Sequence, residues 1–364
     1  MNTTQKVKLD YVWLDGYETK NIRNKTKYMS LDILEVDTDG RPSMKSPEKV
    51  LSLLPDWSFD GSSTKQAVGN NSDLVLRPVR VVRNPIEQFK INAFIVLCEV
   101  LNPDGSPHES NTRHDLIRSI SETNQKEMMF GIEQEYTFIN REGSPLGWPD
   151  NPEEQGKYYC GVGGDVIRGR EIADNHAMAC LSADLLFEGT NAEVMMSQWE
   201  YQIGAGNAVL VSDHLWISRY LLQLLSERYS VCVSYDPKPV EGDWNGSGAH
   251  VNFSTKYMRQ DSNMEYLSVL CEGMEKHHDE SISKYGEGNE RRLTGDHETA
   301  HIDEYSFGIS DRGASIRIPL STVVKKGRGH LEDRRPAANI DPYECLESIV
   351  RTVSKVHQES LVST

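Results

Sequence analysis

The stretch GIEQEYTF, residues 131–138, places two glutamates in a segment that otherwise has the composition of a β-strand. Side chains alternate along a strand, so Glu133 and Glu135 lie on one face and the residues between and beside them lie on the other. Two neighbouring carboxylates that leave water repel each other unless a cation or a shared proton neutralises them. The stretch therefore predicts either a solvated strand face or a site for positive charge.

The composition narrows the class of protein. At 364 residues the chain is long enough for one large domain or two ordinary ones. Its net charge of -16 argues against nonspecific nucleic-acid binding and against attachment to anionic membranes, since both use a basic surface. Six scattered cysteines without a CxxC pair favour a reducing compartment over a disulfide framework. Because no apolar run reaches the ~20 residues that span a bilayer and no secretion signal is present, we expect a cytoplasmic protein.

The order of strand and helix patterns predicts an α+β fold with two domains. Segments rich in branched and aromatic residues dominate the first hundred residues, and helical patterns alternate with strands after LNPDGSPHES, residues 101–110. We therefore expect domains at 1–107 and 108–364. Helices are predicted over 168–187, 213–229 and 262–278, and a last helix from Asp341, where Pro342 and Glu344 suit a helix start.

Further acidic and imidazole groups interrupt apolar segments later in the chain. Glu193 and Glu200 are seven residues apart, so in a sheet they converge only if the chain turns or bulges between them. The stretch NGSGAHVNF, 245–253, puts His250 on a strand after two glycines that permit close approach of a ligand. Glu332 lies in a charged run that equally suits a solvated surface. Taken singly, each of these groups also has a purely structural explanation.

Taken together, five glutamates and one histidine make a ligand set for hard divalent ions. Such a set suits Mg²⁺ or Mn²⁺ better than thiolate-preferring Zn²⁺, and no cysteine belongs to it. Two ions side by side fit phosphoryl transfer, in which cations neutralise the charge of ATP and of the migrating phosphoryl group. Arginine binds carboxylate and phosphate bidentately, and four arginines are candidates for this role: Arg292, Arg312, Arg317 and Arg334.

Ten motifs in order along the chain resemble the glutamine synthetase family, specifically its shorter type II class. They run from LPDWSFDGSST, 54–64, through FGIEQEYTF, 130–138, to LEDRRPAANIDPY, 331–343, and so span nearly the whole chain. The resemblance implies a small N-terminal β-grasp domain and a larger catalytic α+β domain of the glutamine synthetase/guanido kinase type. It also implies a homo-oligomer of two stacked pentameric rings, with active sites formed between subunits.

The resemblance also assigns roles to single residues. Asp60 matches the residue that helps bind and deprotonate ammonium in the neighbouring subunit's site, and Glu298 matches a flap glutamate that closes over the substrate and can accept a proton. One metal would be held by Glu135, Glu193 and Glu200, and the metal nearer the nucleotide by Glu133, His250 and Glu332. The remaining matches are Trp244, Asn245, Gly246, Arg292, Arg312 and Arg334 for glutamate and its acyl phosphate, and Glu200, Asn252, Ser254, Arg312, Arg317 and His330 for the nucleotide.

The implied reaction joins ammonia to the γ-carboxylate of L-glutamate through γ-glutamyl phosphate, giving L-glutamine, ADP and phosphate. Two alternatives stay open: a γ-glutamyl ligase for another amine, which turnover of small alkylamines would reveal, and an inactive scaffold without metal-dependent ATP turnover. Three positions depart from the type II pattern, namely Asp243 in place of Asn, Asp296 in the flap, and His330 at the nucleotide-base pocket. None of the three removes a proposed ligand or proton acceptor.

Overall fold

The computed structural model describes residues 4–36, 41–87, 91–152 and 157–362, and the chain divides into two compact units. The first unit consists of the residues up to His114 together with Met178–Leu185 and Trp216–Leu221. The second consists of Asp115–Ala177, Leu186–Leu215 and Leu222–Thr364. The predicted α+β class is confirmed, because helices accompany sheets in which most strand pairs are antiparallel. The predicted domain boundary at residue 107 stays a prediction.

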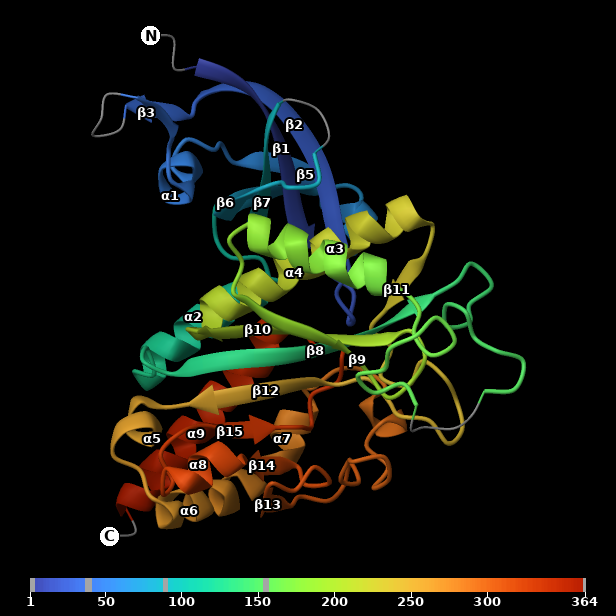
Figure 1. Cartoon of the computed structure of the whole chain (residues 1–364). Helices are drawn as coiled ribbons and strands as arrows, with labels where there is room; N and C mark the ends of the chain where they lie inside the picture. Colours follow the sequence, from blue (N-terminus) through green and yellow to red (C-terminus); the bar gives the residue numbers. More distant parts are fainter. Residues whose placement is uncertain (1–3, 37–40, 88–90, 153–156, 363–364) are drawn as a thin grey trace. The chain divides into compact units, whose positions relative to one another are not determined.

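A five-stranded sheet in the order β2-β1-β7-β6-β5 forms the first unit (Figure 1). Its central strands β1 and β7 run parallel, and the outer pairs are antiparallel, which is in keeping with the expected β-grasp arrangement. Val7, Leu9 and Tyr11 alternate along β1 and are fully buried in the core of this unit. The elements are β1 (Thr4–Leu14), β2 (Ile22–Asp32), β3 (Leu34–Val36), β4 (Pro42–Met44), α1 (Pro47–Leu51), β5 (Trp57–Asp60), η1 (Gly61–Thr64), β6 (Asp73–Arg83) and β7 (Asn92–Leu101).

The second unit is built on a sheet in the order β13-β14-β15-β12-β8-β10-β9, with β11 also paired to β8. Its pairs are antiparallel except for β13 and β14. The strands are β8 (Met129–Ile139), β9 (Phe187–Ala192), β10 (Gln198–Gly206), β11 (Cys232–Ser234), β12 (Ala249–Ser254), β13 (Phe307–Ile309), β14 (Ile316–Ile318) and β15 (Leu331–Asp333). The opening stretch therefore lies in β8, between β12 and β10.

The four predicted helices are confirmed, with ends set by caps and turns. α4 begins five residues before its predicted start, because the Asn207 side chain accepts from the Leu210 N–H and caps the helix. α3 ends at Ser182, and Asp184 follows in the left-handed conformation at φ 57°. The helices are α2 (Thr112–Thr123), α3 (Arg170–Ser182), α4 (Ala208–Tyr229), α5 (Lys256–Gln260), α6 (Met264–Glu275), α7 (His278–Ile282), η2 (Asn289–Arg291), α8 (Leu320–Val324) and α9 (Pro342–Val362).

The last helix, α9, shows how the sequence pattern sets packing. Asp341 Oδ1 accepts from the Tyr343 N–H at 3.0 Å, which satisfies one free donor of the first turn. An apolar stripe along α9 is fully buried, and α6 and α7 both contact α9, as their grouping in Figure 1 shows. The stripe consists of Leu346, Ile349, Val350 and Val353.

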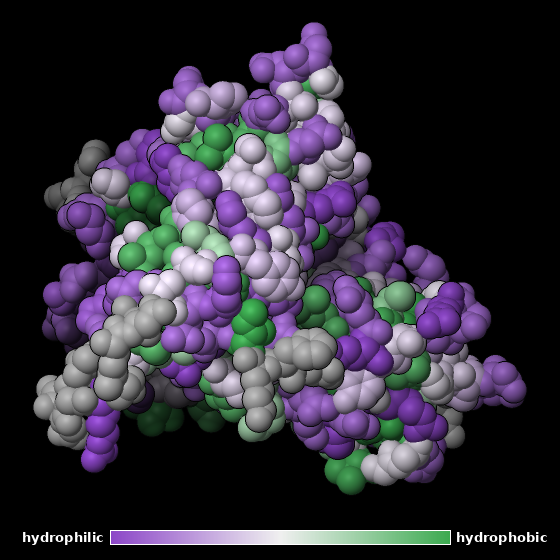
Figure 2. Space-filling model, turned by 90° about the horizontal axis from the view of Figure 1, so that it is seen from above, coloured by the Kyte–Doolittle hydropathy of each residue, from purple (hydrophilic) through white to green (hydrophobic). Residues whose placement is uncertain are grey.

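Hydrophilic side chains cover most of the face shown in Figure 2, and hydrophobic residues form small, separate groups there. This distribution agrees with the large negative net charge of the chain. Across the described part of the chain, every helix is too short or too polar to cross a membrane. The six cysteines are all free thiols.

Candidate active site

One face of the second unit's sheet carries acidic and imidazole groups on neighbouring strands. Glu200 on β10 lies opposite Glu135 on β8, and His250 on β12 lies opposite Glu133 on β8. Glu332 on β15 lies opposite Asn252, which is two residues from His250 on the same strand. Because β8 lies between β10 and β12, its two glutamates reach groups on both neighbouring strands.

The chain turns between Glu193 and Glu200, as their convergence in a sheet requires. β9 ends at Ala192, and the Glu193 N–H donates to the Gln198 carbonyl at 2.9 Å across the turn into β10. Ser197 adopts a left-handed conformation at φ 67°, which completes this turn. The two carboxylates are thereby brought to one place although they would point apart on a flat strand.

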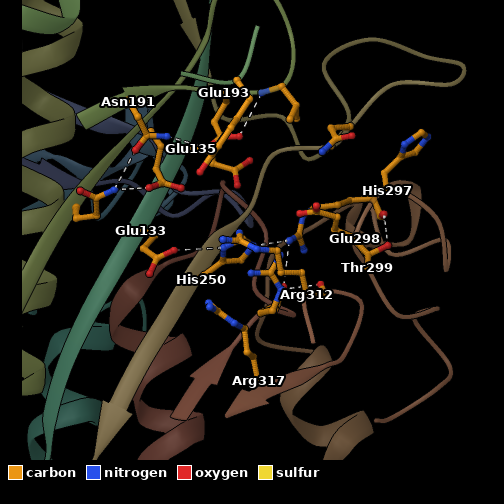
Figure 3. Close-up of a pocket in the computed structure, with 18 residues that line it drawn as sticks. Glu133, Glu135, Asn191, Glu193, His250, His297, Glu298, Thr299, Arg312 and Arg317 are labelled. Atoms are coloured by element: carbon orange, nitrogen blue, oxygen red, sulfur yellow. Dashed lines mark hydrogen bonds and ion pairs between the residues drawn. The ribbon is translucent and has the colours of Figure 1, made fainter. Parts of the chain in front are cut away.

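The six side chains form two groups of three, and in each group the ligand atoms lie within 4.8 Å of one another. We call Glu135, Glu193 and Glu200 the carboxylate cluster, and Glu133, His250 and Glu332 the histidine cluster. In Figure 3, Glu193 and Glu135 lie near Asn191, whereas His250 lies between Glu133 and the arginines. Each group has the members that the sequence resemblance assigns to one metal, and the assignment itself stays a prediction.

The carboxylate cluster is buried, since each of its residues is 8% exposed. Desolvation and then the neighbouring carboxylates raise the pKa of Glu193 to about 9 and the pKa of Glu200 to about 8. Desolvation also raises the pKa of Glu135. At neutral pH the cluster therefore cannot carry three negative charges without a countercharge. Three carboxylates in close contact suit a hard divalent cation, which supplies that charge.

Amide side chains of β9 and β10 orient the carboxylates. Asn191 Nδ2 donates to Glu193 Oε1 at 3.0 Å, and Gln202 Nε2 donates to Glu200 Oε1. Glu135 Oε2 accepts from Gln198 Nε2 at 3.1 Å. Asn191 and Gln202 line the cavity but were absent from the predicted site. Each lies two residues from a predicted ligand, a spacing that strand alternation places on the same face and that was the available signal for them.

The histidine cluster is held by arginines. Glu332 is 1% exposed, and its two oxygens accept from Arg317 Nη1 at 2.6 Å and from Arg334 Nη1 at 2.7 Å. His250 Nδ1 lies 3.6 Å from Glu133 Oε2 and 3.8 Å from Glu332 Oε1. Burial, followed by the nearby Arg334, holds the pKa of His250 well below its usual value. The imidazole is therefore neutral, which is the form that binds a metal ion.

A cavity of about 570 Å³ opens onto both clusters. Its volume lies within the range of small-molecule binding sites. Asn245 Oδ1 at its wall is buried and, within the described ranges, has no hydrogen-bond partner, so it can accept from a bound amine. The predicted residues in the wall are Glu133, Glu135, Glu193, Glu200, Asn245, Gly246, His250, Arg292, Glu298, Arg312, Arg317 and Arg334. The wall also contains Tyr159, Asn191, Val194, Gln202, His297 and Thr299, which were not predicted.

Several predicted residues of this unit lie outside the cavity wall. Trp244 is buried, and its ring lies 4.9 Å from that of Trp148. Glu332 lies behind the two arginines that contact it. The other three are Asn252, Ser254 and His330. Asn252 donates to Glu133 Oε1 at 2.7 Å, and the oxygens of Ser254 accept from Arg259. The backbone of His330 forms hydrogen bonds with the Thr322 hydroxyl. Their nucleotide-binding roles stay predictions.

The glycines before His250 leave room for the side chain of Arg292, and Gly246 also lines the cavity. The close approach of a ligand to them stays a prediction. A Cβ atom on Gly248 would lie 2.5 Å from Arg292 Nη2, and one on Gly246 would lie 2.6 Å from Arg292 Cγ. Arg292 Nη2 in turn lies 3.1 Å from His250 Nε2. The absence of two side chains thus lets Arg292 pass closely along the backbone to the histidine.

Asp60 lies in the first unit, at the end of β5. Its Oδ1 accepts from the Ser62 hydroxyl at 2.6 Å, and its Oδ2 accepts from the Ser63 hydroxyl at 2.8 Å. These hydrogen bonds lower the pKa of Asp60 to about 2, and the bond from Ser62 has the largest effect. The exposed carboxylate is therefore negatively charged at any physiological pH and suits a cationic ligand. Its role toward ammonium stays a prediction.

Comparison with known proteins identifies the family. Residues 109–354 match the family model described as glutamine synthetase, catalytic domain. The chain is 46% identical to a glutamine synthetase of Emericella nidulans over 349 residues, which cover 95% of this chain and 92% of that protein. It is 48% identical to a glutamine synthetase of Streptomyces viridochromogenes over 350 residues, which cover 95% of this chain and 96% of that protein. It is 45% identical to the mitochondrial glutamine synthetase 1 of Drosophila melanogaster over 353 residues, which cover 95% of this chain and 84% of that protein. The chain therefore belongs to the glutamine synthetase family, whose enzymes use ATP and divalent metal ions to make glutamine from glutamate and ammonia.

Proposed function

We propose that this protein joins ammonia to the γ-carboxylate of L-glutamate in an ATP-dependent reaction that yields L-glutamine, ADP and phosphate. Similarity to glutamine synthetases over 95% of the chain supports this reaction. The observation that carries the proposal is the meeting of two metal-type clusters and four arginines at one cavity. This combination suits the transfer of a phosphoryl group between anionic reactants.

The carboxylate cluster is assigned to one divalent cation and the histidine cluster to a second. Mg²⁺ or Mn²⁺ fits both clusters, because five of the six ligands are carboxylates and none is a thiolate. Without a cation, Glu193 and Glu200 keep their protons up to about pH 8, and a bound cation would replace those protons. When bound, the cations neutralise charge on ATP and on the phosphoryl group in transfer.

The arginines bind the anionic reactants. Arg292, Arg312 and Arg334 contact glutamate and its acyl phosphate, and Arg317 contacts the nucleotide phosphates. All four line the cavity, and the buried Arg317 Nε has no partner among the described residues, so it can donate to a ligand. Transfer of the γ-phosphoryl group of ATP to the glutamate carboxylate forms γ-glutamyl phosphate, which carries phosphate as a good leaving group. Asn245 Oδ1 suits the α-ammonium group of glutamate.

Two carboxylates accept the protons that ammonium loses. Asp60, acting from a neighbouring subunit, binds ammonium and takes its proton, and the resulting ammonia attacks the acyl phosphate. Because its pKa is low, Asp60 stays ionised and attracts a cation, but it is a weak base. The proton transfer to it is therefore unfavourable by itself, and the consumption of ammonia in the next step drives it. Glu298 at the cavity wall accepts the second proton from the new amide nitrogen and excludes water.

The assembly and location belong to the same proposal. A homo-oligomer of two pentameric rings with shared active sites follows from the family resemblance and would place Asp60 of one subunit at its neighbour's cavity. A cytoplasmic location is supported by six free cysteines, which suit a reducing compartment. The D. melanogaster relative is named as mitochondrial, so imaging of the tagged native protein is the test of location.

The reaction is tested by incubating purified protein with glutamate, ATP, ammonium and either Mg²⁺ or Mn²⁺, and by measuring glutamine and phosphate together. We expect equal amounts of both products, and none when any component is omitted. Methylamine and ethylamine in place of ammonium test the alternative amine. Preferred turnover of an alkylamine, or no metal-dependent turnover of ATP, would overturn the proposal.

A further inference from the structure

The flap glutamate lies at the tip of a hairpin whose two sides bond to each other. The Ile302 N–H donates to the Leu293 carbonyl at 3.0 Å, and Thr294 and His301 form an antiparallel bridge. At the tip, His297 and Glu298 both have left-handed backbone conformations, with φ 52° and 61°. Two such residues in succession are unfavourable unless they are glycine, so surrounding contacts must hold the tip in place.

A second segment of the chain presents a carboxylate from a firmly anchored turn. The Trp244 N–H donates to the Gly242 carbonyl at 2.9 Å, which folds a tight turn with Asp243 at its centre. Trp244 is buried with its ring 4.9 Å from that of Trp148, and its carbonyl accepts from Lys238 Nζ. The backbone of Asp243 is therefore fixed, whereas its side chain is 67% exposed.

His297 connects the flap tip to this turn. Its Nε2 lies 2.8 Å from Asp243 Oδ1, a contact that is an ion pair when the imidazole is protonated. Figure 3 shows His297, Glu298 and Thr299 together at one end of the cavity, away from Asn191. We propose that His297 and Asp243 form a latch that holds Glu298 over the cavity, which makes His297 a positioning residue of the flap.

The catalytic consequence of the latch rests on the proposed function, in which Glu298 keeps water from γ-glutamyl phosphate. When the flap tip is held less often, water attacks the acyl carbon, the bond from that carbon to the phosphate oxygen breaks, and glutamate and phosphate form. ATP is then consumed without glutamine. A loosened latch therefore has a specific signature, which is phosphate released in excess of glutamine.

Hydrogen exchange of the hairpin, 293–302, tests the latch without any catalytic assay. The full-length protein without ligands is compared with Asp243→Asn, His297→Gln and the double variant by mass spectrometry. We expect tip amides to exchange about two- to fivefold faster in each single variant, the factor for a partly exposed ion pair. The double variant should match His297→Gln, because the contact with Asp243 is already lost in that variant.

The chain offers a matched control in Asp303→Asn. Asp303 Oδ2 lies 3.6 Å from His301 Nδ1, so this substitution removes a histidine–aspartate contact close to the hairpin without touching the turn at Asp243. Exchange at the tip should stay at the wild-type rate. Equal exchange in all variants, or a faster tip in Asp303→Asn, would overturn the latch.

The ratio of phosphate to glutamine is the second readout. The excess of phosphate over glutamine should be about two to five times larger in Asp243→Asn and His297→Gln than in the wild type, and should keep its wild-type value in Asp303→Asn. Faster exchange with an unchanged excess of phosphate would overturn the claim that the latch controls Glu298. If the wild type makes no glutamine, the proposed function fails, and hydrogen exchange still decides whether the latch exists.

Discussion

Glu200 lies directly opposite Glu135 on the neighbouring antiparallel strand, a position in which two like charges destabilise a sheet. Burial increases that repulsion, and Glu193 adds a third carboxylate to the same place. Bound protons relieve the repulsion up to about pH 8, and a divalent cation relieves it once the carboxylates ionise. The stability of this sheet is therefore linked to both pH and metal binding.

The metal-free protein should lose stability as the pH rises. The pKa of Glu200 is raised from 4.5 to about 8 in the folded protein, so its protonated form stabilises the fold fully below pH 4.5. This contribution decreases as the pH rises and is gone above about 8. Thermal unfolding in the presence of a chelator should show a Tm that falls by several degrees over this range. Saturating Mg²⁺ should remove most of the fall.

Glu200→Gln is the control for this pH dependence. The variant cannot ionise at that position, so the metal-free Tm should fall less steeply and should exceed the wild-type Tm at pH 8. It should also gain less from Mg²⁺. An equal slope in both proteins would show that the carboxylate cluster does not carry the linkage.

Replacing Glu332 should damage the fold as well as the activity. The carboxylate pairs with Arg317 and with the buried Arg334, so Glu332→Ala leaves positive charge without its partner. Breaking a buried pair in this way costs about 3–5 kcal/mol, which urea unfolding would measure. A loss below about 1 kcal/mol would contradict this reading of the contacts.

Because Glu332→Ala is expected to destabilise the fold, metal binding is better tested with a variant at another ligand. Loss of activity in Glu332→Ala is expected but would combine a structural effect with a chemical one. Glu193 lies in the turn after β9 and contacts the Asn191 amide and the Val194 N–H rather than an arginine. Glu193→Gln should therefore weaken metal binding with little change in the free energy of unfolding.

Gly248→Ala should reduce glutamate binding through Arg292. The added Cβ would lie 2.5 Å from Arg292 Nη2 and 3.0 Å from His250 Nε2, so the flexible end of the arginine must move. We expect the KM for glutamate to rise about tenfold, which is about 1.4 kcal/mol of binding. Gly69→Ala is the matched control, since its Cβ meets no atom within 4 Å. Similar KM values for glutamate in the two variants would contradict the close contact between Gly248 and the end of Arg292.

The low pKa of Asp60 should depend on its serines. Without the Ser62 and Ser63 hydroxyls, the double variant Ser62→Ala, Ser63→Ala should raise that pKa from about 2 toward 3.8. A carboxyl NMR titration measures the change, with Asp60→Asn to assign the signal. The acid limb of ammonium-dependent activity should move to higher pH in parallel. An unchanged titration would rule out these hydrogen bonds as the cause.

Strand periodicity was enough to predict that Glu133 and Glu135 share a face. It could not predict that Glu200 would lie opposite Glu135, because pairing between distant strands leaves no trace in the local pattern. The convergence of Glu193 with Glu200 depended on a turn whose φ 67° residue is a serine, which gives no glycine signal. The resemblance to a family supplied both groupings where the residue pattern alone did not.

Other features were outside the reach of local patterns. The β2 strand consists mostly of polar residues and buries only Leu31 fully, so its composition did not stand out. The position of Arg292 beside Gly248 was not predicted, because the two residues lie far apart in the sequence. The contact between His297 and Asp243 joins two turns and likewise has no sequence signal.

Calorimetric titration of the metal-free protein with Mn²⁺ is the most direct test that the two clusters are metal sites. We predict two ions per chain in the wild type and one in Glu193→Gln, with circular dichroism to show that the variant is folded. No binding to the wild type, or the same two ions in Glu193→Gln, would contradict the assignment of the carboxylate cluster.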